Sequence, residues 1–389
     1  MLIYFLVFVV AFFYFLYTWR SAQAKSSKLF AIIMAYMAIF IGMGDMIGGY
    51  DRYIYGEMFD IIANETRGSK NYVSVYYFIN GSEWGYFLWE ILVSFITRNR
   101  YVYILITTIM MYVLYFRAIK RYVREYPLAV IVFLGFFYYF SITYIRQAIA
   151  VGIVWNAVDY IWKRDLKRFL LLYALAVSFH NSALIVLPLY FIGSRHFSYR
   201  VVFSFLIICL IVGLSPIPQM LLALSGEIGD MTYRTEQYAN DVAGVRVDYL
   251  LQVSVLLYIV YQNRNVLPVN RKTEMFLNIL FFYFGLLLMF IRFGQGGRFG
   301  WYMIIAIIYL FTEISINKRT HHVTRNIIVF LCFILFYRIT TLWAFNLTPY
   351  KTFLTNGYPS GEEYIYERWE YDERYTSNKF YRQAIDIHF

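Results

Sequence analysis

Apolar residues fill this chain in consecutive blocks of about 15 to 25 residues, and this block length restricts the fold more than any other feature. About 20 apolar residues in a helix cross the ~30 Å hydrocarbon layer of a bilayer. Only helices and closed barrels satisfy backbone polar groups in lipid, and the blocks lack strand-like alternation. The sequence therefore predicts an all-α fold, a polytopic membrane helical bundle of about 10–12 hydrophobic helices. The expected blocks are residues 1–18, 29–47, 84–97, 101–116, 127–142, 144–162, 169–192, 201–214, 249–262, 275–291, 301–316 and 326–346.

The composition also indicates a membrane protein. Of the 389 residues, 60% are hydrophobic and 15% are charged, and the mean hydropathy is +0.53. Soluble domains carry about 25% charged residues. The first block lacks the basic start and small-residue cleavage site of a signal peptide, so we expect a retained helix. Cys209 and Cys332 lie in different apolar blocks without a ligand spacing, and we interpret both as small buried hydrophobes.

The net charge of +11 does not indicate a nucleic-acid partner, because the basic residues cluster in short loops beside the apolar blocks. The positive-inside rule places these clusters in the cytoplasm. We place the longer acidic or mixed stretches, 48–83, 215–248 and 347–389, outside. The expected organisation is a transmembrane domain over 1–346 and an extracytoplasmic aromatic and acidic tail over 347–389. The six basic clusters are residues 20–28, 117–124, 163–168, 195–200, 264–272 and 318–325.

If every block crossed, several basic clusters would lie on the wrong side. The conflict disappears if block 84–97, which is short and contains Glu90, lies along the outer interface. Block 169–192 would then be re-entrant and broken near His180-Asn181-Ser182, although an ordinary crossing stays open. This topology has about ten crossings and both termini outside.

Two polar residues inside apolar blocks are the best indication of a site. Arg146 precedes Gln147 within block 144–162, and His180 lies within block 169–192. An ionised guanidinium in the bilayer costs a few kcal/mol or more, so such residues usually face a cavity, a pathway or a charged ligand. Arg146 is either a bidentate phosphate donor or a snorkelling residue that reaches the headgroups. His180 is either a general base or a helix-packing residue.

Further candidates lie at the outer ends of the blocks. Asp51 is a candidate general base, or else a solvated partner of Arg52. Glu83 precedes Tyr86 at the start of an interfacial helix, where an acidic residue also complements the helix dipole. The stretches 48–83 and 347–389 are rich in aromatic residues, which suit stacking on sugars as well as belts at the interface. The outer cations are Arg292 and Arg298, in a glycine-rich hairpin, and Arg338.

These cations and carboxylates are expected on one side of the bundle, around an aromatic rim. Such a site suits phosphates on a lipid carrier. The sequence has no Cys/His ligand cluster, so we expect neither a metal nor a cofactor. Arginine side chains would then stabilise a departing diphosphate themselves.

Several short motifs, in this order and spacing, resemble one family. They are Gly49-Tyr-Asp-Arg-Tyr53, the Glu-x-Gly-Tyr of residues 83–86, Ile145-Arg-Gln-Ala-Ile-Ala150, the Lys-Arg-x-Leu-Lys-Arg of residues 163–168, and Phe179-His-Asn-Ser-Ala-Leu-Ile-Val-Leu-Pro188. Over about residues 30–300 the chain resembles the EpsG family, which contains Wzy-type polymerases of bacterial exopolysaccharide and O-antigen repeat units.

The resemblance implies a glycosyltransferase in the bacterial inner membrane, GT-C-like in broad character. A glycan on undecaprenyl diphosphate would be transferred at the outer face to the non-reducing sugar of another carrier-linked unit. Arg146 matches the family's Arg-Gln-Ala element, and His180 its Phe-His motif. We expect His180 or Asp51 to act as the general base. The resemblance also implies a chain-length regulator as a possible partner. The expected substrate-binding residues are Arg52, Glu83, Tyr86, Gln147, Arg292, Arg298 and Arg338, with Arg146 on the diphosphate.

Three alternatives stay open at this stage. A flippase for lipid-linked oligosaccharide would need outward cations as well, but it should show inverted repeats, which the sequence lacks. An O-antigen ligase would use the same donor. A membrane acyltransferase would instead place its histidine beside an acidic partner at a cytoplasmic site.

Overall fold

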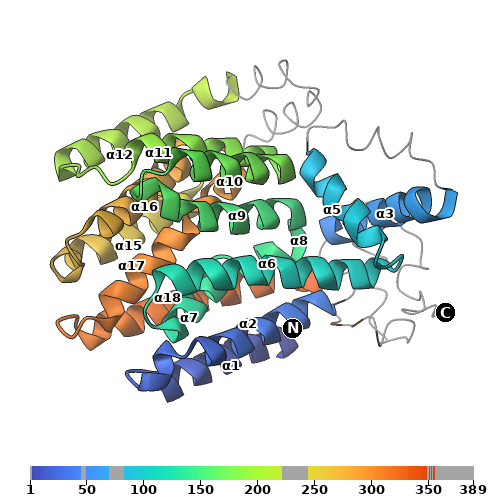
Figure 1. Cartoon of the computed structure of the whole chain (residues 1–389). Coiled ribbons are helices and arrows are strands. Elements are labelled where there is room, and N and C mark those ends of the chain that lie inside the picture. The colour runs from blue at the N-terminus through green and yellow to red at the C-terminus, as the bar shows by residue number, and fades with distance from the viewer. Residues whose placement is uncertain are drawn as a thin grey trace. The chain divides into compact units, whose positions relative to one another are not determined.

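The computed structural model describes residues 2–44, 50–69, 83–220, 244–347, 350, 352 and 354, and the regular elements named here are all helices (Figure 1). In chain order they are α1 (Leu2–Thr18), η1 (Ala22–Lys25), α2 (Ser27–Gly42), α3 (Tyr50–Ala63), η2 (Asn64–Ser69), α5 (Trp84–Ser94), α6 (Arg100–Tyr122), α7 (Tyr126–Phe136), α8 (Phe140–Thr143), α9 (Ile145–Trp162), α10 (Leu166–Phe179), η3 (Asn181–Val186), α11 (Leu187–Ile192), α12 (Tyr199–Leu214), α15 (Val247–Gln262), η4 (Arg264–Val266), α16 (Arg271–Met289), η5 (Gly296–Met303), α17 (Ile304–Ile316), α18 (His322–Leu342) and α19 (Ala344–Leu347).

The predicted polytopic helical bundle is confirmed. Within the described residues, four helical segments are long and apolar enough to cross a membrane. They are Arg100–Tyr122, Arg271–Met289, Gly296–Ile316 and His322–Leu342. Six shorter apolar helices, each of 10–17 residues, accompany them. The number and direction of the crossings stay predictions.

The helices follow the predicted blocks closely, with two informative details. The block from 169 to 192 is broken where expected: α10 ends at Phe179, and the 3₁₀-helix η3 begins at Asn181. Helix α5 has 11 residues, so at about 1.5 Å per residue it is too short to cross a bilayer. The polar stretch after residue 48, by contrast, contains α3 and the π-helical turn η2, which its mixed composition did not reveal.

The chain forms two compact units. The first comprises residues 1–156, 171–184 and 326–389, and the second comprises residues 157–170 and 185–325. The predicted boundary at residue 346 stays a prediction, because most of the tail lies outside the described residues. The aromatic residues expected on sugar between positions 70 and 82 also lie outside them.

Helix α7 forms the core of the first unit. All 11 of its residues are buried, as is typical of a helix that is apolar on every side. Helices α1, α2 and α6 contact it, and Phe30 of α2 stacks on Tyr126 with the ring centroids 4.6 Å apart. At Gly135, an added Cβ would lie 2.7 Å from the Cα of Cys332, so the missing side chain lets α18 approach closely. Cys332 is buried, as predicted.

Helix α16 has the same role in the second unit, where it contacts α11, α12, α15, α17 and η5. Its Asn278 side chain donates hydrogen bonds to the carbonyls of Gly193 and Arg195, at 2.9 and 2.8 Å. These bonds satisfy backbone groups where the chain leaves α11. Cys209 of α12 is buried in this unit.

Candidate functional site

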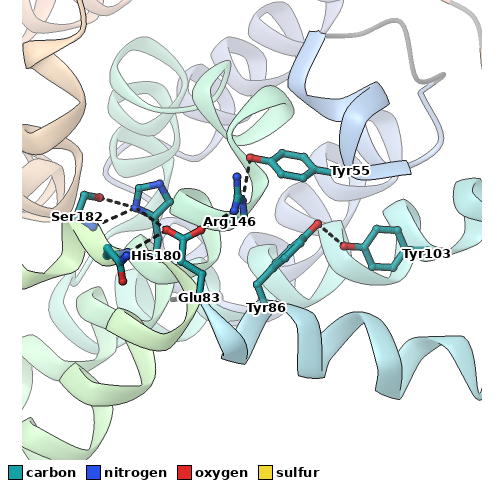
Figure 2. A network of polar contacts seen from close by, with 8 residues as sticks. Tyr55, Glu83, Tyr86, Tyr103, Arg146, His180 and Ser182 are labelled. Atoms are coloured by element: carbon teal, nitrogen blue, oxygen red, sulfur yellow. Dashed lines mark hydrogen bonds and ion pairs between the residues drawn. The ribbon is translucent and has the colours of Figure 1, made fainter. Parts of the chain in front are cut away.

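Arg146 lies in the first turn of α9, in the first unit, where the chain breaks after α8 and restarts as a helix. The positive end of a helix dipole and a guanidinium both favour a nearby anion. Glu83 supplies it: Arg146 Nη1 donates to Glu83 Oε2 at 2.5 Å (Figure 2). Both side chains are largely removed from solvent, with 14% and 8% exposed. The two candidate site residues Arg146 and Glu83 are therefore paired with each other.

Gly85 explains why Glu83 can reach this position. A Cβ at Gly85 would lie 2.9 Å from the Cβ of Ser178, closer than real side chains approach. The glycine therefore lets the start of α5 pack directly against the end of α10. This contact carries Glu83 to the break between α10 and η3.

The second oxygen of Glu83 binds the backbone at that break. Glu83 Oε1 accepts a hydrogen bond from the N–H of Asn181 at 3.1 Å. The same oxygen lies 4.0 Å from His180 Nδ1, which is beyond hydrogen-bond distance. Figure 2 shows Glu83 between Arg146 on one side and His180 on the other. A buried carboxylate with both oxygens engaged is fixed in orientation.

The His180 imidazole caps the first turn of η3. Its Nδ1 accepts a hydrogen bond from the backbone N–H of Ser182 at 3.2 Å, and the Ser182 hydroxyl lies 2.7 Å from the same nitrogen. The His180 carbonyl accepts from the N–H of Ala183 at 3.0 Å. The side chain is 20% exposed, so part of it is accessible to solvent. Ser182 thus fixes the His180 ring in place, and the ring lies near Glu83.

Two aromatic rings flank the guanidinium of Arg146. Its Cζ lies 5.3 Å from the ring centroid of Tyr55 and 5.8 Å from that of Tyr86, which is cation–π distance. The two rings meet edge to face at 5.6 Å. Arg146 Nε also donates to the hydroxyl of Tyr55 at 3.4 Å. These contacts orient the arginine without neutralising it.

Behind Tyr86 lies a buried polar chain. The hydroxyls of Tyr86 and Tyr103 are 2.5 Å apart, and Tyr103 donates to Glu90 Oε1 at 3.3 Å. Glu90 has no exposed surface, and its Oε2 has no hydrogen-bond partner among the described residues. Burial raises the pKa of Glu90 to about 8, although the nearby hydroxyls of Tyr86 and Tyr103 and the charge of Arg146 oppose the shift. The hydroxyl of Tyr86 points toward Tyr103 and away from Glu83 in Figure 2. The hydrogen bonds from Tyr86 through Tyr103 to Glu90 therefore fix the Tyr86 ring beside Arg146.

Asp51, the other candidate base, lies in the first turn of α3 and is partly exposed. Burial raises the pKa of Tyr55, the charge of Arg146 lowers it, and Asp51 and Glu83 raise it. Asp51 is therefore within electrostatic range of the phenol that binds Arg146. The structure brings Asp51, Glu83, Tyr86, Arg146 and His180 into one neighbourhood.

The neighbouring candidates Arg52 and Gln147 are buried. Arg52 is 1% exposed, and its Nη2 donates to the carbonyls of Ile41 and Gly44 at 2.7 and 2.9 Å. This contact caps the C-terminal end of α2. Gln147, beside Arg146 on α9, is 2% exposed. Substrate binding by these two residues stays a prediction.

The hairpin cations belong to the second unit. Arg292 Nη1 donates to the carbonyl of Leu214 at 3.5 Å, and the Cζ of Arg298 lies 5.7 Å from the ring centroid of Trp301. A further arginine, which the sequence analysis missed, lies with them: Arg246 donates to the Gly294 carbonyl at 2.8 Å and pairs with Asp248. Arg338, on α18 in the first unit, is exposed. The substrate-binding roles of Arg292, Arg298 and Arg338 stay predictions.

Three features of the site were not predicted from the sequence. Tyr55 lies 91 positions from the arginine it binds, and nothing local distinguishes it from the other outer tyrosines. Tyr103 is one of many aromatic residues in an apolar helix. The His180 cap had a local signal, because a serine two residues after a histidine can present its N–H to the ring.

Chemically, the cluster can bind an anionic oxygen through Arg146 and hold a carboxylate and an imidazole close to it. No group of three or more His, Cys, Asp or Glu side chains in the described part of the chain is arranged to bind a metal. The expectation of metal-free chemistry stays a prediction.

Comparison with known families shows a match to the EpsG family. The model of the EpsG family matches residues 28–352, a range that includes all five clustered site residues. No curated protein and no solved structure matches the chain.

Proposed function

Because this chain belongs to the EpsG family, we propose that it polymerises lipid-linked oligosaccharide repeat units during bacterial polysaccharide biosynthesis. The substrate would be a glycan on undecaprenyl diphosphate at the outer face of the inner membrane. The membrane helices and the family support this role at the level of a membrane protein of polysaccharide biosynthesis. The single observation that carries the finer proposal is the placement of Arg146 in a largely buried position between Glu83 and the rings of Tyr55 and Tyr86.

Arg146 suits the diphosphate for three reasons. A guanidinium carries five N–H donors, more than its contacts to Tyr55 and Glu83 occupy. It lies in the first turn of a helix, where the dipole also favours an anion. The two flanking tyrosine rings hold the planar group in one orientation, which favours bidentate binding of phosphoryl oxygens.

The proposed reaction exchanges one bond for another. The acceptor hydroxyl oxygen forms a bond to the anomeric carbon of the donor glycan, and the bond from that carbon to the diphosphate oxygen breaks. The diphosphate leaves with the bonding electron pair, and the hydroxyl gives up its proton. Arg146 stabilises the charge that develops on the departing diphosphate.

Reconstitution tests the proposal directly. The protein in liposomes is given a purified undecaprenyl-diphosphate-linked repeat unit, and glycan length and released undecaprenyl diphosphate are measured. A ladder of products together with equimolar carrier release is the expected result. Transfer of a single glycan to a different acceptor would instead indicate a ligase. Movement of the substrate across the bilayer without a new bond would indicate a flippase.

A further inference from the structure

The geometry around His180 determines which of its ring nitrogens carries the proton. A backbone N–H can only donate a hydrogen bond, and the N–H of Ser182 is directed at His180 Nδ1 at 3.2 Å. Nδ1 must therefore present a lone pair. A neutral imidazole whose Nδ1 accepts carries its proton on Nε2. The Ser182 hydroxyl, 2.7 Å from Nδ1, can donate to the same lone pair.

This arrangement is the reverse of the one that a histidine base requires. A histidine base has its Nδ1–H held by a carboxylate or carbonyl, so that the Nε2 lone pair faces the hydroxyl it deprotonates. A carboxylate is close by, but Glu83 Oε1 lies 4.0 Å from Nδ1 and accepts from the Asn181 N–H instead. The other oxygen of Glu83 is paired with Arg146. Glu83 thus leaves Nδ1 to the η3 backbone.

We propose that His180 serves the transfer as a neutral Nε2–H hydrogen-bond donor to a phosphoryl oxygen of the bound diphosphate, and not as the base. This inference rests on the proposed function. Glu83 contacts Arg146 and also lies near His180, so an anion that binds Arg146 is close to the imidazole as well. Figure 2 shows the second ring nitrogen on the edge of the ring away from Ser182. A hydrogen bond to a charged oxygen is stronger than a neutral one, and it strengthens further as the leaving group gains charge.

If His180 keeps its proton, the base role passes to Asp51, the other candidate base, which lies within electrostatic range of Tyr55. The acceptor hydroxyl transfers its proton to the Asp51 carboxylate as the bond to the anomeric carbon forms and the bond to the diphosphate breaks. His180 keeps its Nε2 proton before and after the step. Asp51 is partly exposed, so it can return the proton to water.

His180 could act as a hydrogen-bond donor, as a general base or only as the cap of η3. Two substitutions separate these roles, because the side-chain amide of each replacement reproduces one ring nitrogen. Asparagine places an acceptor near the Nδ1 position and is a favoured helix cap, but it has no donor at Nε2. Glutamine places an N–H near the Nε2 position and loses the cap. For a donor we expect His180→Gln to keep turnover within about tenfold of wild type and His180→Asn to lose on the order of 10²-fold.

The other outcomes overturn the proposal. Equal losses in both variants, together with a fall in the wild-type rate at low pH that both variants lack, would identify His180 as a base. Full activity in His180→Asn together with a loss in His180→Gln would show that His180 serves only as the cap of η3. His196→Gln is the matched control, because that side chain is 79% exposed and we expect no change in turnover.

A spectroscopic measurement tests the tautomer independently of activity. The chain has five histidines, so the protein in nanodiscs with ¹⁵N-labelled histidine gives few signals, and the signal missing in His180→Asn identifies His180. We expect an unprotonated Nδ1 and a protonated Nε2 at neutral pH. A protonated Nδ1 would overturn the inference whether or not the protein forms a glycan ladder.

If the wild-type protein forms no ladder, the proposed function fails, and inorganic diphosphate serves as the probe of the donor role. We expect it to shift the His180 Nε2 signal in the wild type and not in Arg146→Ala. The absence of a shift in the wild type would remove the donor role.

Discussion

Arg146 and Glu83 form an ion pair across 63 positions of sequence, with Nη1 and Oε2 2.5 Å apart. The pair joins the first turn of α9 to the residue that precedes α5. Each charge lies in a largely buried position that would be costly for it alone. The pair therefore fixes the site and at the same time provides the cation that the proposed substrate needs.

Substitution of the pair separates its structural contribution from its chemical one. Arg146→Gln leaves the Glu83 carboxylate buried without its cation, and we expect a loss of about 3 to 5 kcal/mol in the free energy of unfolding. Arg146→Gln combined with Glu83→Gln removes both charges, so most of the stability should return. Thermal unfolding in detergent measures this recovery.

The same double variant tests the role of Arg146 in the reaction. If Arg146 binds the diphosphate, the stable double variant stays inactive in the ladder assay, because the amide carries no positive charge. A stable double variant with wild-type ladders would show that the arginine is only structural.

Close packing at Gly85 gives a second prediction. Gly85→Ala places a methyl group 2.9 Å from the Cβ of Ser178, and we expect a loss of about 1 to 3 kcal/mol because α5 must move. Glu83, two residues earlier, would shift from Asn181 and Arg146, so turnover should fall as well. Tm and ladder length measure the two effects.

Ser178→Gly in the Gly85→Ala background removes the side chain that the new methyl group meets. It should restore part of the activity, although a glycine within α10 itself costs about 1 kcal/mol. Native turnover and Tm in Gly85→Ala alone would refute the packing explanation.

The sequence predicted the helices well because their apolar blocks are long and bounded by polar loops. It also singled out Arg146 and His180, since an ionisable residue inside an apolar block usually has a role, and the structure places both beside Glu83. Their roles in a reaction stay predictions. It could not predict their partners, because contacts over 91 and 98 positions, such as Tyr55 with Arg146 and Glu83 with Asn181, depend on how the helices pack.

Other limits of the sequence have local physical causes. The contact of Arg52 with the carbonyls of Ile41, in α2, and Gly44, just after it, is one that a sequence pattern does not reveal, and its expected place on substrate or beside Asp51 stays a prediction. Helix α3 was missed because it lies in a stretch of mixed charged and aromatic residues, although its buried residues Tyr55, Phe59, Ile62 and Ala63 follow helical spacing. Arg246 lies at the end of a polar stretch that gave no sign of structure.

The base role of Asp51 gives a third prediction. Asp51→Asn removes the proton acceptor but keeps the shape of the side chain, so we expect turnover to fall on the order of 10²- to 10⁴-fold. The wild-type rate should decline toward low pH as the carboxylate becomes protonated, and the residual rate of Asp51→Asn should lack that decline. Glu57→Gln, on the same helix, is the charge-matched control. An unchanged pH–rate profile in Asp51→Asn would transfer the base role to another group.

Glu90 gives a fourth prediction, about stability instead of rate. Burial raises its pKa from 4.5 to about 8 in the folded protein, so the folded state favours the protonated acid. Below pH 4.5 the carboxyl is protonated in both folded and unfolded chains and has no effect. As the pH rises from about 4.5 to about 8, the unfolded chain loses its proton first, and the wild-type protein loses stability.

Glu90→Gln keeps the shape and a hydrogen-bond acceptor for Tyr103 but cannot ionise. The variant should therefore match the wild type in Tm near pH 4.5, and its Tm should exceed that of the wild type by an increasing margin up to about pH 8, where the difference becomes constant. Thermal unfolding across this pH range measures the two curves. Parallel curves would mean that Glu90 is ionised in the folded protein, and the polar chain from Tyr86 to Glu90 would then contain a buried charge stabilised by Arg146.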